Sequence, residues 1–358
     1  MNQGPVLHVL HSFRAEGSQR LALDLIRRWA ELHGERGAVA TLSDESEVVR
    51  ERFTDEGAEV VDDLRGLGIG DLVRSAEKLL RTSRARAVLC YTVGPHVAMA
   101  LACRRTGTPL ILHLGNAPPD ERLARTKIAL QLLIGRLLGT IHVACSDHVL
   151  HASLAAYPLR PVDIVAVANG VDLKWFAGVR EQREAPDGNP VIGMVGSFEI
   201  HKRQEVLLDA LHLLRARGIE ARLVLVGTGS RRDELLARAR TLQLGSAVTW
   251  VPLSRDVREE LRSMDVFAYA VSNQEGLGIA LVEALAAGLP AVASDVGAAR
   301  EVLEEGALGT LVSGGADQWA DRLLAAVRMP PVPLERLARF DIDETARAYR
   351  RVIDGAAK

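Results

Sequence analysis

The chain of 358 residues has few aromatic side chains, few cysteines and almost no net charge. Aromatic residues make up 4% of the chain and the formal charge is -2, whereas a general nucleic-acid-binding protein needs a basic face and rings for base stacking. We therefore expect no nucleic-acid partner. Cys90, Cys103 and Cys145 lie in apolar contexts without metal or redox spacing, which indicates reduced thiols in the protein core.

The sequence also lacks long hydrophobic runs and lysine. No stretch is apolar enough to span a bilayer, and the first residues lack a signal-peptide pattern, so we expect a cytoplasmic protein. Arginine dominates the cations, so a lysine inside a motif stands out against the composition. The lysines are Lys78, Lys127, Lys174, Lys202 and Lys358.

The length of the chain is typical of two domains of ordinary size. Its hydrophobic fraction is 48%, and strand-like and helix-like patterns alternate from Val6–Leu10 onward. Alternation of this kind predicts parallel sheets covered by helices on both faces. A charged segment with proline and glycine, 178–189, shows no apolar period and reads as a linker. We predict domains at 1–177 and 190–340, followed by a C-terminal helix within 341–358.

The most informative stretch runs over residues 272–290, SNQEGLGIALVEALAAGLP. A strand-like run leads into a polar turn with Gly276 and Gly278, and an apolar helix follows from about Ile279 to Ala287. A helix that begins at a glycine turn presents unpaired backbone N–H groups and the positive end of its dipole. Such a helix start is a site for phosphate.

Two glutamates accompany this turn, and seven residues separate them. Glu275 lies in the turn and Glu283 on the early helix, and because both would repel phosphate, hydroxyl groups are the expected partners. Glu-Gly-Leu-Gly, the spacing of the glutamates and the following Ala-Leu-Ala-Ala-Gly-Leu-Pro resemble the donor-site signature of retaining glycosyltransferases of family 4. The resemblance implies the α/β fold called GT-B. In that fold two Rossmann-like doubly wound domains face each other across a cleft, and the C-terminal helix crosses back onto the first domain.

The resemblance also implies a function. The protein would be a retaining glycosyltransferase (a hexosyltransferase) that moves a sugar from a nucleoside-diphosphate sugar to the hydroxyl of a sugar, glycan or glycolipid acceptor. The pathway would be polysaccharide, lipopolysaccharide or glycolipid synthesis. Glu283 would hold the ribose and Glu275 the sugar hydroxyls. No cofactor and no metal is implied. The diphosphate would lie against backbone amides near Gly276, Leu277, Gly278 and Ile279.

The turn after the strand at 190–196 matches the family in part. Family members have Gly-Arg, four further residues and Lys, and both cations clamp the diphosphate. Lys202 stands six residues after Gly196, in register with that lysine, and would stabilise the charge that grows on the leaving group. Ser197 replaces the usual arginine, and Arg203 either compensates or points to solvent.

Two further positions in the second half match donor contacts of the family. Gly227 closes a strand in Val-Gly-Thr-Gly, which in the family lies close to the nucleotide. Pro252 and Leu253 follow the next strand, where family members hold the base with backbone groups.

The first half contributes three candidates. Gly17 opens a helix where the family shows two adjacent glycines facing the donor diphosphate, although a plain turn fits this stretch equally well. His113 closes a strand at the edge where doubly wound folds keep their sites. A lone histidine there usually only ends a strand, but the family often has one near the donor sugar, so we assign His113 to a catalytic set with Lys202 and Glu275. Asn116 is a candidate acceptor contact.

The segment from Glu121 to Leu138 is a basic amphipathic helix. The pattern slightly favours a helix with a solvated basic face, but it also fits peripheral contact with the cytoplasmic face of the inner membrane. Its cations are Arg122, Arg125, Lys127 and Arg136.

Two other functions stay open from the sequence. A GT-B nucleotide-sugar epimerase is disfavoured by the Glu275–Glu283 pair. A nucleotide-sugar-binding protein without catalysis would explain Ser197, but Lys202, His113 and both glutamates are retained.

Overall fold

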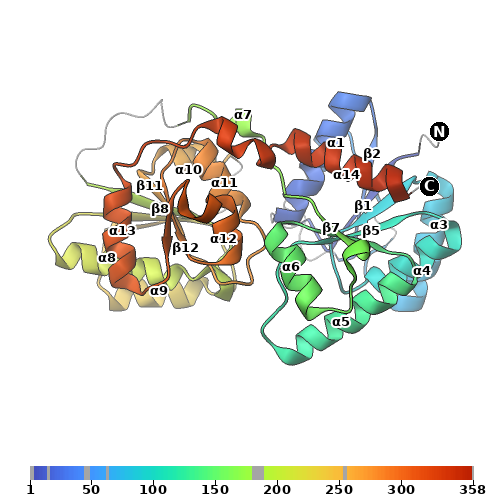
Figure 1. The fold of residues 1–358 in the computed structure, drawn as a ribbon, viewed down its shortest axis with the longest axis horizontal. Coiled ribbons are helices and arrows are strands. Elements are labelled where there is room, and N and C mark those ends of the chain that lie inside the picture. Colours follow the sequence, from blue (N-terminus) through green and yellow to red (C-terminus); the bar gives the residue numbers. More distant parts are fainter. Residues whose placement is uncertain are drawn as a thin grey trace. The chain divides into compact units, whose positions relative to one another are not determined.

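The computed structural model describes residues 4–13, 17–43, 49–61, 64–179, 189–252 and 256–356. The chain forms two compact units (Figure 1). The first comprises Met1–Gly170 and Ile342–Lys358, and the second comprises Val171–Asp341. The division thus falls seven residues before the expected end of the first domain. Most of the expected linker, residues 180–188, lies outside the described residues.

The first unit is built on a parallel sheet of seven strands in the order β3-β2-β1-β4-β5-β6-β7. The strands at its centre are buried along their whole length and mostly apolar, as expected when helices cover both faces. The strands are β1 (Val6–Leu10), β2 (Gly37–Thr41), β3 (Glu59–Val61), β4 (Ala87–Cys90), β5 (Leu110–Leu114), β6 (Ile141–Ala144) and β7 (Ile164–Ala166).

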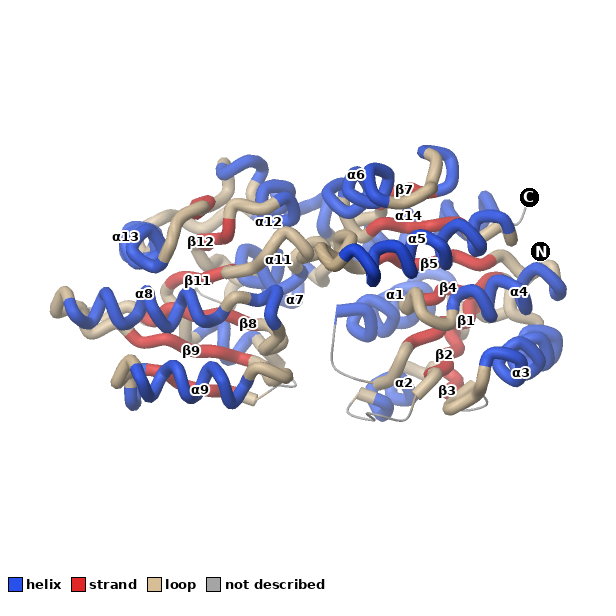
Figure 2. Tube along the Cα trace, turned by 90° about the horizontal axis from the view of Figure 1, so that it is seen from below, coloured by secondary structure: helices blue, strands red, loops and turns tan. Residues whose placement is uncertain are grey.

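Helices follow the strands of this sheet, and α3, α4 and α5 lie side by side (Figure 2). Ser146 begins α6 as an N-cap, because its hydroxyl accepts a hydrogen bond from the Val149 amide at 3.1 Å. The helices are α1 (Gly17–His33), α2 (Arg50–Asp55), α3 (Ile69–Ser83), α4 (His96–Thr106), α5 (Arg122–Leu137), α6 (Asp147–Ala156) and the C-terminal α14 (Ile342–Ala356), with a 3-10 turn at Pro161–Asp163.

The C-terminal helix packs within the first unit against α1. The Trp29 indole donates a hydrogen bond to the Ala346 carbonyl at 3.1 Å, and the Thr345 hydroxyl donates to the Ala168 carbonyl at 2.8 Å. A Cβ on Gly170 would lie 2.6 Å from the Cα of Ile342, so only glycine allows this close approach of the backbone. The return of the last helix to the first domain is thereby confirmed.

The second unit has a parallel sheet of six strands in the order β10-β9-β8-β11-β12-β13. On one face α13, α8 and α9 lie side by side (Figure 2). The strands are β8 (Val191–Val195), β9 (Arg222–Val226), β10 (Val248–Val251), β11 (Val266–Tyr269), β12 (Ala291–Ser294) and β13 (Thr310–Val312). The helices are α7 (Leu173–Phe176), α8 (Gln204–Ala216), α9 (Arg232–Thr241), α10 (Arg258–Arg262), α11 (Ile279–Ala286), α12 (Gly297–Val302) and α13 (Ala316–Ala326). Short 3-10 segments cover Ile200–Lys202, Gly245–Ala247, Glu304–Gly306 and Leu334–Phe340.

Both sheets are doubly wound, so the predicted fold class is confirmed. In the first unit the strand order reverses between β1 and β4, and in the second between β8 and β11. Ligands of open α/β sheets bind at such switch points, outside the carboxyl ends of the strands. The loops after β8 and β11 are therefore where a site is expected in the second unit.

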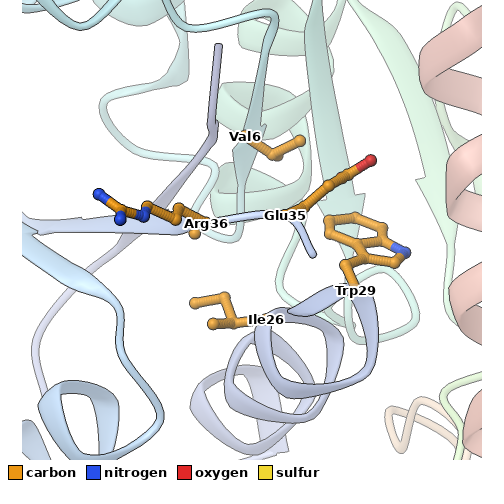
Figure 3. A pocket seen from close by; sticks show the side chains of 6 residues that line it. Val6, Ile26, Trp29, Glu35 and Arg36 are labelled. Atoms are coloured by element: carbon orange, nitrogen blue, oxygen red, sulfur yellow. The ribbon is translucent and has the colours of Figure 1, made fainter. Parts of the chain in front are cut away.

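A small hollow at the opposite edge of the first sheet is not such a site (Figure 3). It lies at the amino-terminal ends of β1 and β2 and leaves no room for a water molecule. A Cβ on Gly37 would lie 2.7 Å from the side chain of Ile26, which shows how tightly this edge is packed. The hollow is lined by Val6, Ile26, Trp29, Glu35, Arg36 and Gly37.

Candidate active site

The loop after β8 is tied to the loop after β9. The Gly196 amide donates to the Val226 carbonyl at 3.0 Å, and the Phe198 amide donates to the Thr228 carbonyl at 2.9 Å. The two loops approach so closely that a Cβ on Gly227, which has a φ of 140°, would lie 2.2 Å from the Gly196 oxygen. Glycine is thus required at the position that the sequence analysis placed near the nucleotide.

Two polar side chains brace the same loop. Buried Gln204 donates from Nε2 to the Ser197 carbonyl at 2.8 Å. Glu199 accepts hydrogen bonds from the Ser230 amide at 3.0 Å and from its hydroxyl at 2.6 Å. These contacts fix the segment that ends in Lys202, and the sequence analysis missed them.

The loop after β11 is held against the loop after β8. The Ser272 amide donates to the His201 carbonyl at 2.8 Å, and the Glu275 amide donates to the Ser272 carbonyl at 3.2 Å. Gly278 then begins α11 with a φ of 94°, and a Cβ there would lie 2.7 Å from the Tyr269 hydroxyl oxygen. A side chain at Gly278 would be both strained and obstructed.

These two loops bring Lys202 and Glu275 into contact. Lys202 Nζ lies 2.5 Å from Glu275 Oε2, and the side chains are 14% and 10% exposed. Nζ also lies 5.5 Å from the ring centroid of Tyr269, the last residue of β11. The pair is placed at the switch point between β8 and β11. One cation and one anion are therefore fixed together at the edge where this fold binds ligands.

The Glu275 carboxyl stays ionised at neutral pH. Burial is the largest single influence and raises the pKa of the Glu275 carboxyl, but the Lys202 ammonium and weaker contributions from neighbouring groups together outweigh it, so the net pKa is lowered. The Tyr269 hydroxyl also favours the carboxylate. Burial lowers the pKa of the His201 imidazole, and the charge of Lys202 lowers it further, so His201 is neutral beside the pair.

The other donor residues predicted in the second half of the chain lie on the loops of the same sheet and on α11. Glu283 is buried on α11, and Ile279 is its first residue. Arg203 is exposed and begins α8 with a φ of 40°. Pro252 is exposed directly after β10, whereas Leu253 lies outside the described residues. Gly276, Leu277 and Gly278 are buried between Glu275 and α11.

The candidates of the first unit occupy the ends of α1 and β5. Gly17 is the first residue of α1, and Asn116 is exposed in the loop after β5. His113 is 3% exposed, and its Nδ1 lies 2.8 Å from the Tyr349 hydroxyl of α14. Burial lowers the pKa of His113 to about 4, so the imidazole is neutral. Neither Tyr349 nor Tyr269 lies in a sequence pattern that indicates the site.

Among the described parts of the chain, no helix combines the length and apolarity needed to cross a membrane.

Similarity to known proteins agrees with this architecture. The family described as Glycosyl transferases group 1 matches residues 178–344. Phosphatidyl-myo-inositol mannosyltransferase of Mycolicibacterium smegmatis is 38% identical over 286 residues, which cover 68% of this chain and 70% of the relative. The protein of the same name from Mycobacterium leprae is 34% identical over 206 residues, or 54% of each chain. The chain thus spans about half the length of that relative.

A solved structure shows the fold over nearly the whole chain. HepE of Anabaena, crystallised with UDP and glucose, matches with a TM-score of 0.83 at 19% identity, covering 98% of this chain and 99% of its own. Two doubly wound units with the last helix in the first unit define a GT-B protein. The chain belongs to the group 1 glycosyl transferases.

Proposed function

We propose that the protein is a retaining glycosyltransferase of family 4 that uses a nucleoside-diphosphate sugar in glycolipid or polysaccharide synthesis. The observation that carries the proposal is the buried contact of Lys202 with Glu275 at the switch point of the second sheet. The names of the mannosyltransferase relatives, and the UDP and glucose bound to HepE, support it. The narrower family and the retaining mechanism are implied by the signature around Glu275.

The roles follow from charge. The Lys202 ammonium and the amides at the start of α11 would stabilise the negative charge on the departing diphosphate. Glu275 would accept hydrogen bonds from sugar hydroxyls. Because each side chain holds the other in place, neither needs to reorganise during the reaction.

The transfer step balances without a protein nucleophile. The acceptor oxygen forms a bond to the anomeric carbon on the face from which the phosphate oxygen leaves, and the anomeric carbon–oxygen bond breaks. The leaving phosphate takes the acceptor proton. We propose that no metal is needed, since a lysine and a helix start supply the positive charge.

A melting-temperature screen tests the donor site. UDP, GDP, ADP and their common sugar conjugates are added with and without chelator, and one base is expected to raise the melting temperature equally in both. A ligand at 100 times its Kd stabilises the folded state by about 2.7 kcal/mol. Release of nucleoside diphosphate after acceptor addition then separates transfer from binding alone. If no nucleotide shifts the melting temperature, even with acceptor, the proposal is wrong.

We also propose that α5 contacts an anionic membrane surface. Its 16 residues contain no acidic side chain, and only Leu132 and Gly135 are buried. Leu123, Leu130 and Leu137 recur every seven residues and are 76%, 59% and 72% exposed. Residues seven apart share one stripe of a helix, so three leucines face outward together beside exposed basic side chains.

Vesicle sedimentation tests this surface. The protein should bind vesicles that contain phosphatidylglycerol more strongly than pure phosphatidylcholine, with a contribution of about 1 kcal/mol for each basic residue near the surface. Leu123→Ser with Leu130→Ser should reduce binding at least tenfold. Ile69→Ser is the matched control, because Ile69 begins α3 and is 79% exposed. Equal binding to both kinds of vesicle would contradict the proposal.

A further inference from the structure

Tyr349 connects the C-terminal helix to the histidine at the end of β5. Both side chains are buried, and Tyr349 Oη lies 2.8 Å from His113 Nδ1, although the residues are 236 positions apart in sequence. Contacts that do not involve His113 fix α14. They include the hydrogen bonds of Trp29 and Thr345 with backbone carbonyls. Tyr349 is thus placed independently of its partner.

The direction of this hydrogen bond follows from the chemistry of the two groups. Burial keeps the His113 imidazole neutral, so one ring nitrogen carries hydrogen and the other accepts. Within the described part of the chain, the structure gives the Tyr349 hydroxyl a single hydrogen-bond partner, His113 Nδ1. If Nδ1 carried the hydrogen, the buried phenolic O–H would have no acceptor, which is unfavourable for a buried polar group. Donation from Tyr349 to Nδ1 avoids this and places the imidazole hydrogen on Nε2.

The other side of the ring faces a glycine. A Cβ on Gly115 would lie 3.3 Å from His113 Nε2, closer than ordinary contact. Gly115 and Asn116 are both exposed in the loop after β5. Because glycine has no side chain, it keeps the space beside Nε2 free of a Cβ at the carboxyl end of the strand, where doubly wound folds bind substrates.

We propose that Tyr349 is a positioning residue that holds His113 as the Nε2–H tautomer, so that His113 donates a hydrogen bond to a substrate oxygen instead of acting as a base. The class of partner is an uncharged oxygen acceptor such as a sugar hydroxyl. This inference rests on the proposed function for the presence of a sugar near His113. It makes the C-terminal helix part of the machinery of the first unit.

Nitrogen-15 NMR of the histidine side chains tests the tautomer without any activity. The His113 signal is assigned by its loss in His113→Ala, and it should show Nδ1 as the bare nitrogen and Nε2 as the protonated one. Tyr349→Phe should mix the tautomers. Thr345→Val is the matched control, since it removes another hydrogen bond of the same helix without touching His113. A protonated Nδ1 in the wild type would overturn the proposal.

Kinetics supply the second readout. Tyr349→Phe should lower kcat/KM about tenfold, and in the His113→Ala background it should have no further effect, because it acts through His113. Additive losses would show that Tyr349 only supports the helix and would overturn the positioning role. A wild type that binds no nucleotide and transfers no sugar would instead contradict the proposed function, and the NMR result would stand on its own.

Discussion

Replacing Lys202 by methionine is expected to lower kcat about 10²–10³-fold, the usual loss when a group that stabilises developing charge is removed. Methionine keeps most of the aliphatic stem that packs beside Gly196, where a Cβ would lie 3.7 Å from Lys202 Cε. The ammonium alone is lost. Steady-state release of nucleoside diphosphate at saturating donor measures the effect, and circular dichroism checks the fold.

Two companion variants separate chemistry from stability. Lys174→Met removes an exposed lysine of the same unit and should turn over like the wild type. Lys202→Met leaves Glu275 buried without its counter-ion. Removing one partner of a buried ion pair lowers the free energy of unfolding by about 3–5 kcal/mol. Adding Glu275→Gln should recover stability but not activity. Wild-type turnover in Lys202→Met would remove the lysine from the mechanism.

The parts of the site that the sequence predicted are those set by local backbone geometry. Gly278 has a φ angle of 94°, and this left-handed position precedes α11 where the glycine turn was predicted. Lys202 could be placed because its register depends only on the short loop after β8.

Contacts between distant segments could not be predicted from the pattern. Lys202 and Glu275 are 73 residues apart, and their pairing depends on β8 and β11 being neighbours in the sheet. The contact of Tyr349 with His113 could not be predicted either, because the apolar period of α14 indicates which face is buried but not which residues that face contacts. A polar residue inside a buried strand or helix, such as Tyr269, can be recognised as part of a site only when its neighbours in space are known.

Short elements were missed for a related reason. The helices α7, α10 and α12 have four, five and six residues, which is less than two turns and too little for a period to appear. The composition of the charged segment 178–189 indicated a domain boundary there, whereas the two units divide at Gly170, where the composition does not change clearly. The residues just after Gly170 pack with the second unit, since the Val171 amide donates to the Phe340 carbonyl at 2.8 Å.

Glu275→Gln separates the charge of this residue from its shape. The amide keeps the size and one oxygen that can accept a hydrogen bond from Lys202, but it carries no charge and forms no ion pair. We expect kcat/KM to fall about 10²–10³-fold, as when a preorganised polar group in an active site is removed. The variant should lose more affinity for the native nucleoside-diphosphate sugar than for the free nucleoside diphosphate, since the proposed partner of Glu275 is a sugar hydroxyl. An equal loss for both ligands would place Glu275 outside the sugar site.

The same variant changes the dependence of stability on pH. The folded-state pKa of Glu275 is lowered from its ordinary value of 4.5, so its ionised form stabilises the fold above that value. This contribution is lost as the pH falls below 4.5 toward the folded-state pKa. Denaturant unfolding from pH 7 downward should therefore show that the free energy of unfolding falls more steeply with acid in the wild type than in Glu275→Gln.

Buried neutral histidines such as His113 also lower the free energy of unfolding below pH 6.5, but they do so in both proteins. The difference between the two curves therefore isolates the contribution of Glu275. Parallel curves would mean that the carboxylate does not stabilise the fold and that its place beside Lys202 serves substrate binding alone.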